Sequence, residues 1–148
     1  MKKYAVLCFL LAAATLFFSF SGKRGGDVFE IYLNGKKMLQ QFVHIDKSIK
    51  TLTLASFSEN DRIEVLYSHC GHAGKGRTLT FRNEKNEVIK KLSFGDGNGN
   101  RSLMGFYRKE IAGNKNARMK LYYSSQELPE GKLLAQVVWQ EAKAVVKL

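Results

Sequence analysis

Apolar and polar residues alternate along most of the chain beyond residue 26, and this two-residue period predicts β-strands. The run 27–33 places Phe29 on one face and Glu30 on the other, and the run 36–44 alternates in the same way. Asn34-Gly35 separates the two runs. Asn-Gly between alternating runs indicates a β-hairpin, because both turn positions need a positive φ. The first two strands are therefore predicted to form a hairpin.

The same period predicts further strands, separated by polar or glycine-rich turns. They cover residues 51–54, 62–67, 77–82, 88–94, 118–124 and 132–139. The segment 103–111 fits either a strand or a short helix, and we leave both open. Eight or nine short strands at a spacing of about ten residues predict an all-β fold, either an antiparallel β-sandwich or an open barrel. We expect one such domain over residues 27–140, followed by a tail at 141–148.

The first 21 residues have the three parts of a secretory signal. Lys2 and Lys3 precede an uncharged, mostly apolar stretch of 17 residues, Tyr4–Phe20, and small residues follow it. Cleavage is expected after Ser21, which leaves a short basic linker at 22–26. We therefore expect an exported protein, either periplasmic or secreted. A stretch of this length also reaches the lower limit for a membrane-spanning helix, so an anchor that is not cleaved is the alternative.

Net charge narrows the choice of partners. Loss of Lys2 and Lys3 with the leader lowers the formal charge from +11 to +9, and the remaining basic residues are spread along the chain. Such a charge favours anionic partners, such as an acidic polysaccharide or a lipid surface, and export argues against nucleic acid. Lysines dispersed over alternating strands are also typical of a solvated outer face that prevents edge-to-edge association. We favour this second interpretation.

One loop concentrates the reactive side chains. Leader cleavage removes Cys8, so Cys70 is the only thiol of the expected exported chain and has no internal disulfide partner. Imidazole and thiolate suit Cu or Zn, which makes His69, Cys70 and His72 candidate metal ligands, with His44 as a further one. Alternatively, Cys70 is a small buried side chain and the histidines are polar loop residues. We favour this alternative, which requires no cofactor.

The same loop continues into Gly74-Lys75-Gly76-Arg77. It is not a P-loop, because that motif needs Ser or Thr after its Lys. Glycine amides beside Lys75 and Arg77 could still form a small anion-binding nest.

The sequence offers no recognisable catalytic constellation. Its serines, Ser125 included, have no nucleophile context, and its carboxylates are scattered. Tyr122, Tyr123 and Trp139 could stack on sugar rings, although Tyr123 and Trp139 fit inward-facing core positions equally well. The sequence therefore predicts a non-enzymatic binding or accessory module, with a metal-binding protein as the alternative.

The leader, the Asn-Gly hairpin, the Ser-His-Cys-Gly loop at 68–71 and the lysine-rich closing strands together resemble small exported β-sandwich proteins of Gram-negative bacteria, whose function is unknown. The resemblance covers residues 27–139. It implies architecture and location, and it supplies no catalytic or ligand residues to transfer.

Overall fold

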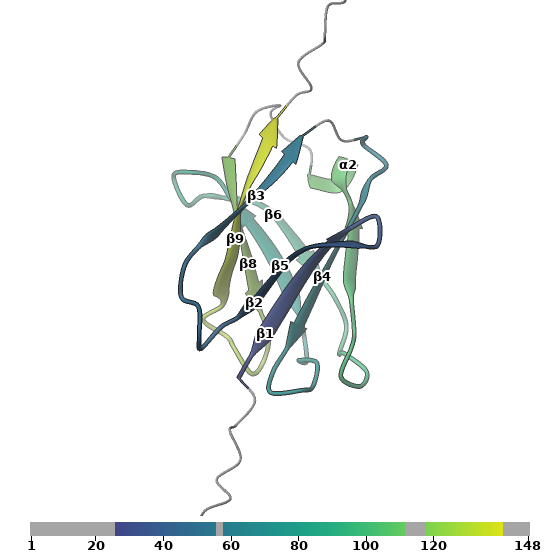
Figure 1. Ribbon diagram of the computed structural model, residues 1–148, viewed down its shortest axis with the longest axis vertical. Helices are drawn as coiled ribbons and strands as arrows, with labels where there is room; N and C mark the ends of the chain where they lie inside the picture. Colours follow the sequence, from purple (N-terminus) through teal and green to yellow (C-terminus); the bar gives the residue numbers. More distant parts are fainter. Residues whose placement is uncertain (1–25, 56–57, 112–117, 141–148) are drawn as a thin grey trace, which may run out of the picture.

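Two sheets face each other across a shared apolar core in the computed structural model (Figure 1). The structure describes residues 26–55, 58–111 and 118–140. The predicted leader, its cleavage position after Ser21 and the predicted tail at 141–148 lie outside these ranges. Within them, strands dominate and the predicted all-β sandwich is confirmed.

The four-stranded sheet is antiparallel throughout and has the order β2-β1-β4-β7. Its strands are β1 (Val28–Leu33), β2 (Lys36–Phe42), β4 (Arg62–Ser68) and β7 (Met104–Tyr107). The predicted hairpin joins β1 to β2, with φ of 48° at Asn34 and 78° at Gly35. These positive values explain why the turn uses Asn and Gly, which adopt the left-handed conformation at low cost.

The five-stranded sheet has the order β3-β9-β8-β5-β6. Its strands are β3 (Lys50–Ala55), β5 (Thr78–Arg82), β6 (Val88–Ser93), β8 (Arg118–Ser124) and β9 (Lys132–Gln140). The pair β3 and β9 is parallel, which departs from the purely antiparallel sandwich expected from the sequence. The chain crosses from the four-stranded sheet to the five-stranded sheet between β2 and β3, and β3 then lies along β9, the last strand. Local periodicity cannot specify which strand becomes the partner of β3.

The segment 103–111 contains both of the elements that its sequence left open. It begins as strand β7 and continues as a short helix, α2 (Arg108–Ile111). Ile111 at the end of this helix is buried in the core. Among the residues that the structure describes, no helix is long and apolar enough to cross a membrane.

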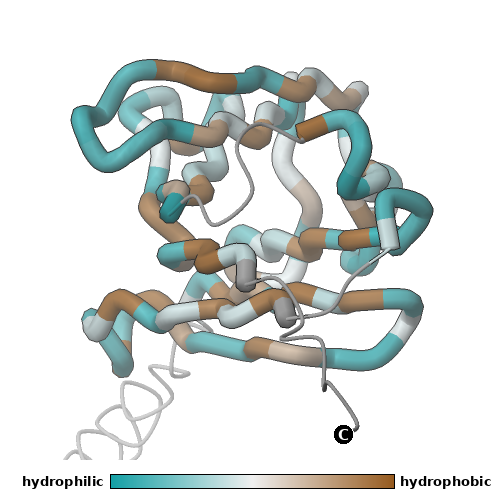
Figure 2. The backbone as a smooth tube through the Cα atoms, turned by 90° about the horizontal axis from the view of Figure 1, so that it is seen from above, coloured by the Kyte–Doolittle hydropathy of each residue, from teal (hydrophilic) through white to brown (hydrophobic). Residues whose placement is uncertain are grey.

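Alternate side chains of both sheets fill the core, and Figure 2 shows the corresponding alternation of hydropathy along the strands. Phe81 from the five-stranded sheet meets Phe106 from the four-stranded sheet edge to face, with ring centroids 5.4 Å apart. Tyr123 and Trp139 belong to this core, as the alternation allowed, whereas Tyr122 points away from it and is half-buried. The outward-pointing residues between the core positions are therefore the ones available for binding.

Candidate functional site

One end of the sandwich gathers polar side chains from both sheets. Asp27 directly precedes β1 and His69 directly follows β4, and the antiparallel pairing of Val28 with Ser68 brings the two together. Ser125 directly follows β8 of the other sheet and reaches the same place. The two sheets are thus joined at this end by residues that are distant in sequence.

The His69 imidazole lies at the centre of this group and is only 7% exposed. Its Nδ1 is 3.4 Å from Oδ2 of Asp27. Its Nε2 is 3.0 Å from the hydroxyl of Tyr123 and 3.1 Å from Oγ of Ser125. Both ring nitrogens therefore have partners. Asp27 adjoins a strand of the four-stranded sheet, whereas Tyr123 and Ser125 lie in or next to a strand of the five-stranded sheet. We call these four residues the His69 network.

A pair of tyrosines packs beneath the His69 network. The rings of Tyr67 and Tyr123 stack with centroids 4.2 Å apart and an interplanar angle of 9°. The Tyr67 hydroxyl donates a hydrogen bond of 3.0 Å to Asp27. Burial raises the pKa of Tyr67 well above its ordinary value, and the hydrogen bond to the Asp27 carboxylate raises it further. Burial also raises the pKa of Tyr123. Both hydroxyls therefore stay protonated and act as neutral hydrogen-bonding groups.

The sequence of carboxylate, imidazole and hydroxyl in the His69 network is that of a Ser-His-Asp catalytic triad. The surroundings differ from those of a reactive serine. Ser125 is only 6% exposed, and the hydroxyl of Tyr123 shares the same imidazole nitrogen. The backbone of Gly74 covers the group: a Cβ at this position would lie 2.5 Å from the Tyr123 hydroxyl and 2.9 Å from Nε2 of His69. The described geometry is that of a closed, buried hydrogen-bonded network.

Of the predicted metal ligands, His69 is the centre of this network, and the other three are exposed. Cys70 is exposed, with φ of 49°, and its thiol donates to Oδ1 of Asp27 at 3.6 Å. His72 is exposed and pairs through its backbone with His69, and their ring centroids are 6.2 Å apart. His44 is also exposed and lies against Gly26.

Within the described ranges, no group of three or more His, Cys, Asp or Glu side chains is placed to hold a metal ion. The metal site with Cu or Zn stays a prediction. The alternative interpretation of the loop is wrong in two respects. Cys70 is exposed rather than buried, because its positive φ turns it away from the strand. His69 is a buried residue rather than a polar loop residue, because it continues the inward face of β4.

The loop that follows uses its backbone amides for internal carboxylates. The N–H of Lys75 donates to both oxygens of Glu127, at 3.2 and 3.0 Å, and the N–H of Gly76 donates to Asp96 at 2.8 Å. Arg77 is buried and donates to backbone carbonyls, with 2.9 Å to Gly95. The hydrogen bonds from the backbone hold the pKa of Glu127 at about 2. Carboxylates of the chain itself thus occupy the predicted anion nest.

A second feature becomes visible only when each strand is assigned to its sheet. The described strands of the five-stranded sheet contain seven basic residues and no acidic one: Lys50, Arg82, Lys90, Lys91, Arg118, Lys120 and Lys132. The strands of the four-stranded sheet contain three basic and two acidic residues: Lys36, Lys37, Arg62, Glu30 and Glu64. Net positive charge is therefore concentrated on the strands of the five-stranded sheet.

The strand register aligns part of this charge into a row. Arg82 of β5 lies opposite Lys120 of β8, which lies opposite Gln136 of β9. The adjacent residue on each strand, Phe81 on β5 and Leu121 on β8, is buried in the core. Since successive side chains of a strand point to opposite faces, the row faces outward. Like charges directly opposite on neighbouring strands destabilise a sheet. This juxtaposition therefore has an electrostatic cost that an anionic ligand would remove.

Local contacts hold the row in place without neutralising it. The Arg82 guanidinium lies over the Tyr122 ring, 5.3 Å from its centroid. Its buried Nε has no hydrogen-bond partner among the residues that the structure describes. The Lys120 ammonium donates to the amide oxygen of Asn86 at 2.7 Å, a neutral acceptor. Both cations keep their charge uncompensated by these contacts.

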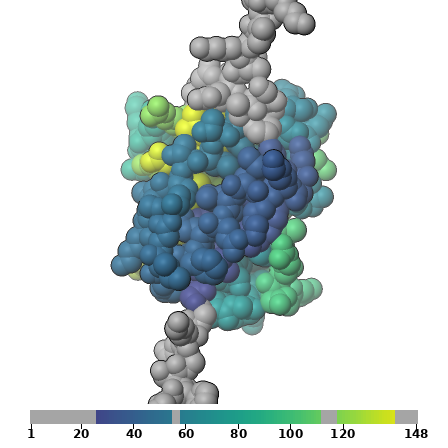
Figure 3. All heavy atoms as spheres, viewed as in Figure 1, coloured from purple at the N-terminus to yellow at the C-terminus, as the bar shows by residue number. Residues whose placement is uncertain are grey.

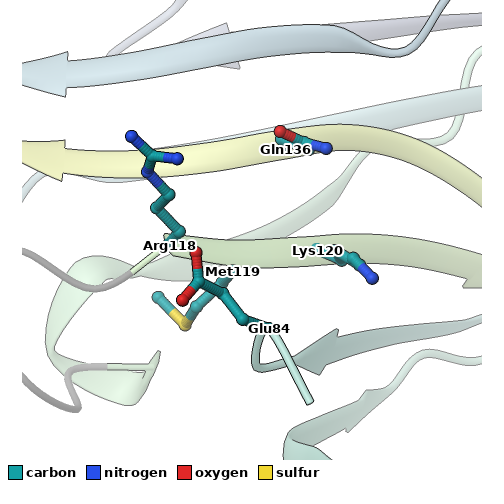
Figure 4. A pocket seen from close by; sticks show the side chains of 5 residues that line it. All are labelled: Glu84, Arg118, Met119, Lys120 and Gln136. Atoms are coloured by element: carbon teal, nitrogen blue, oxygen red, sulfur yellow. The ribbon is translucent and has the colours of Figure 1, made fainter. Parts of the chain in front are cut away.

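A pocket of about 260 Å³ opens beside the row. It is lined by Glu84, Arg118, Met119, Lys120 and Gln136. Figure 4 shows Arg118 and Lys120 extending from β8 and Gln136 from β9, with Glu84 reaching in from the turn after β5. Guanidinium, ammonium and amide donors together suit a carboxylate or sulfate group. We call the outward side of β3, β9, β8, β5 and β6 the basic face.

Comparison of the sequence with protein families and with curated proteins finds no match. The function is therefore inferred from geometry and charge.

Replacing Gly74 with Ala is expected to destabilise the fold, because the new methyl group would force apart the Tyr123 hydroxyl, His69 and Glu127. We expect a loss of about 1–3 kcal/mol in the free energy of unfolding, measured by chemical denaturation. Gly95→Ala is the matched control, since no atom of the described residues lies within 4 Å of its Cβ position. Equal stability of the two variants would contradict the closed network.

Glu127→Gln is expected to lower stability near neutral pH and to have no effect in strong acid. The depressed pKa of Glu127 means that its ionised form stabilises the fold above its ordinary value of 4.5, and that this contribution disappears as the pH falls through about 2. Denaturation of both proteins as a function of pH measures the difference. Glu130→Gln, at an exposed position three residues away, is the control. A difference that persisted unchanged at pH 2 would refute the role of the carboxylate.

Proposed function

We propose that this chain is an exported, non-enzymatic binding module whose basic face binds an acidic polysaccharide. An excess of positive charge on this face carries the proposal, because the described strands of the sheet contain no acidic residue. Four basic residues point outward by strand register: Arg82, Lys91, Arg118 and Lys120. A face with an excess of positive charge attracts a polymer of the opposite sign and raises the rate at which it binds.

The spacing and chemistry of the basic face suit a linear polyanion. Neighbouring strands are about 4.8 Å apart, so a chain lying across them meets a new side chain at short, regular intervals. The row formed by Arg82, Lys120 and Gln136 is extended by Thr51, which lies opposite Gln136 on β3. The cations pair with carboxylate or sulfate groups, while the amide and hydroxyl bind sugar hydroxyls. Tyr122, half-buried beside Arg82, adds an aromatic edge.

The other sites on the molecule support binding rather than catalysis. The His69 network is closed by Gly74, and its hydroxyls and imidazole are hydrogen-bonded to one another. The basic face, in contrast, carries exposed or partly exposed cations with no acidic neighbour on the described strands. An acidic polysaccharide is also a partner that an exported protein meets.

Replacing Arg118 and Lys120 together with Gln is expected to weaken binding of polygalacturonate by about tenfold, which corresponds to about 1.4 kcal/mol. Calorimetry on chain 22–148, which holds every residue of the core, measures the affinity. Lys36→Gln with Lys109→Gln removes the same charge outside the five-stranded sheet and is the control. Affinity should fall as salt rises, and neutral dextran should not bind. Equal affinity of both double variants would refute the basic face as the binding surface.

A fluorophosphonate probe, which labels activated serines, is expected to leave Ser125 unmodified in the folded protein. Its hydroxyl is buried and shares the His69 nitrogen with Tyr123. Mass spectrometry after exposure to the probe reads the outcome directly. Labelling of Ser125 that disappears in a His69→Ala variant would overturn the non-enzymatic assignment and identify the His69 network as a catalytic triad.

A further inference from the structure

The loop between β2 and β3, residues 43–49, displays large apolar side chains to solvent. Ile45 is 83% exposed and Ile49 is 55% exposed, and Phe42 at the end of β2 is 49% exposed. Figure 3 shows this blue segment of the chain on the surface of the molecule. Scattered apolar residues are common on surfaces, but three within the eight residues 42–49 concentrate apolar surface in one segment, which we call the apolar patch.

Hydrogen bonds fix the loop so that the isoleucines stay exposed. The buried side chain of Gln41 donates to the carbonyls of Asp46 and Ser48, at 2.6 and 2.8 Å. The N–H groups of Ile45 and Asp46 both donate to the carbonyl of Phe42, at 3.1 and 3.0 Å. An ion pair of 2.8 Å between Asp46 and Lys50 closes the loop. The exposure of Ile45 is thus built into a well-ordered turn.

The position of this loop relative to the N-terminal segment suggests what it contacts. The N–H of Val43 donates to the carbonyl of Asp27 at 2.9 Å, and Gly26 lies against the His44 ring, so the loop is beside the point where the chain enters the domain. Only residues 21–25 separate Gly26 from the apolar stretch that ends at Phe20. Five residues span at most about 18 Å. A bilayer that holds the leader is therefore within reach of the loop.

Basic residues within the loop and, along the sequence, in the segment before the domain match a negatively charged lipid surface. Lys47 is exposed within the loop, and Lys23 and Arg24 lie in the short segment before the domain. Apolar side chains that enter the boundary of the lipid tails, together with cations at the headgroups, are the two parts of interfacial membrane binding.

We propose that, before the leader is cleaved, loop 43–49 rests on the anionic bilayer in which the leader is embedded, with Ile45 and Ile49 inserted among the headgroups and Lys47 bound to their phosphates. The contact orients the domain with the His69 network end toward the membrane. The basic face runs along the side of the sandwich and stays free, so this inference is independent of polysaccharide binding.

A local probe at position 45 tests the contact. Full-length chain with Cys8→Ser and Cys70→Ser receives one cysteine at position 45 or, as a matched control, at Val88, which is 56% exposed at the far end of β6. Each protein is labelled with an environment-sensitive fluorophore and reconstituted into phosphatidylglycerol–phosphatidylcholine vesicles. The label at 45 should shift to the blue and lose several-fold of its quenching by aqueous iodide, whereas the label at 88 should not change.

The outcomes separate the competing explanations. Pure phosphatidylcholine vesicles should give a smaller effect at position 45, because the basic residues then lack anionic headgroups. An unchanged signal at 45, or equal changes at 45 and 88, would overturn the proposal. A shift at 45 that occurs without vesicles and grows with protein concentration would also overturn it, since it would identify a second copy of the chain as the occupant. Polygalacturonate binding by the same proteins reports separately on the basic face.

Discussion

The arrangement of the two sheets depends on the contacts of the buried His69 imidazole with residues of both sheets. A buried polar group without a partner costs about 1–3 kcal/mol, so both ring nitrogens must be satisfied when the sheets close. Asp27 does this from the start of β1, and Tyr123 and Ser125 do it from the end of β8. Stacking of Tyr67 on Tyr123 requires the same approach of the two sheets. With one thiol expected in the exported chain and no internal disulfide, packing and this network hold that end together.

This structural role changes how the reactive-looking residues are interpreted. The loop with His69, Cys70 and His72 attracts attention in the sequence because it concentrates imidazoles and a thiol. In the structure, Asp27 is shared among His69, Tyr67 and Cys70, and Gly74 covers the hydroxyls beside the ring. The groups that could do chemistry are bound to one another. The available polar chemistry lies instead on the basic face, where Arg82 and Lys120 stand opposite each other without a carboxylate on the strands.

The sequence predicts the local structure well because that structure is determined by neighbouring residues. Period-two alternation locates the strands, and Asn34-Gly35 locates the hairpin. The parallel pairing of β3 with β9 is not predictable in this way, because alternation states which face a residue occupies but not which strand lies beside it. Cys70 was expected to be buried, and the positive φ that exposes it has no signal in the neighbouring residues apart from Gly71.

The candidate sites could not be predicted from the sequence, because they depend on which strands lie side by side. Ser125 lies 56 residues from His69, so nothing near either residue indicates that they meet. The basic face was hidden for a related reason. Lysines and arginines are spread along the whole chain, and only the assignment of β3, β5, β6, β8 and β9 to one sheet shows that the acidic residues are elsewhere. A count of basic and acidic residues in each predicted strand would have shown which strands carry net positive charge. It could not have shown that these strands belong to the same sheet.

The most direct test of the account is to map where an acidic polysaccharide contacts the folded domain. Backbone amide shifts of isotopically labelled chain 22–148, recorded by NMR during titration with polygalacturonate, resolve the contact residue by residue. The account predicts that the largest changes occur in the central strands of the basic face, around Arg82, Lys120 and Gln136, and that the His69 loop is unaffected. Changes centred on Cys70 and His72, with the basic face silent, would contradict it.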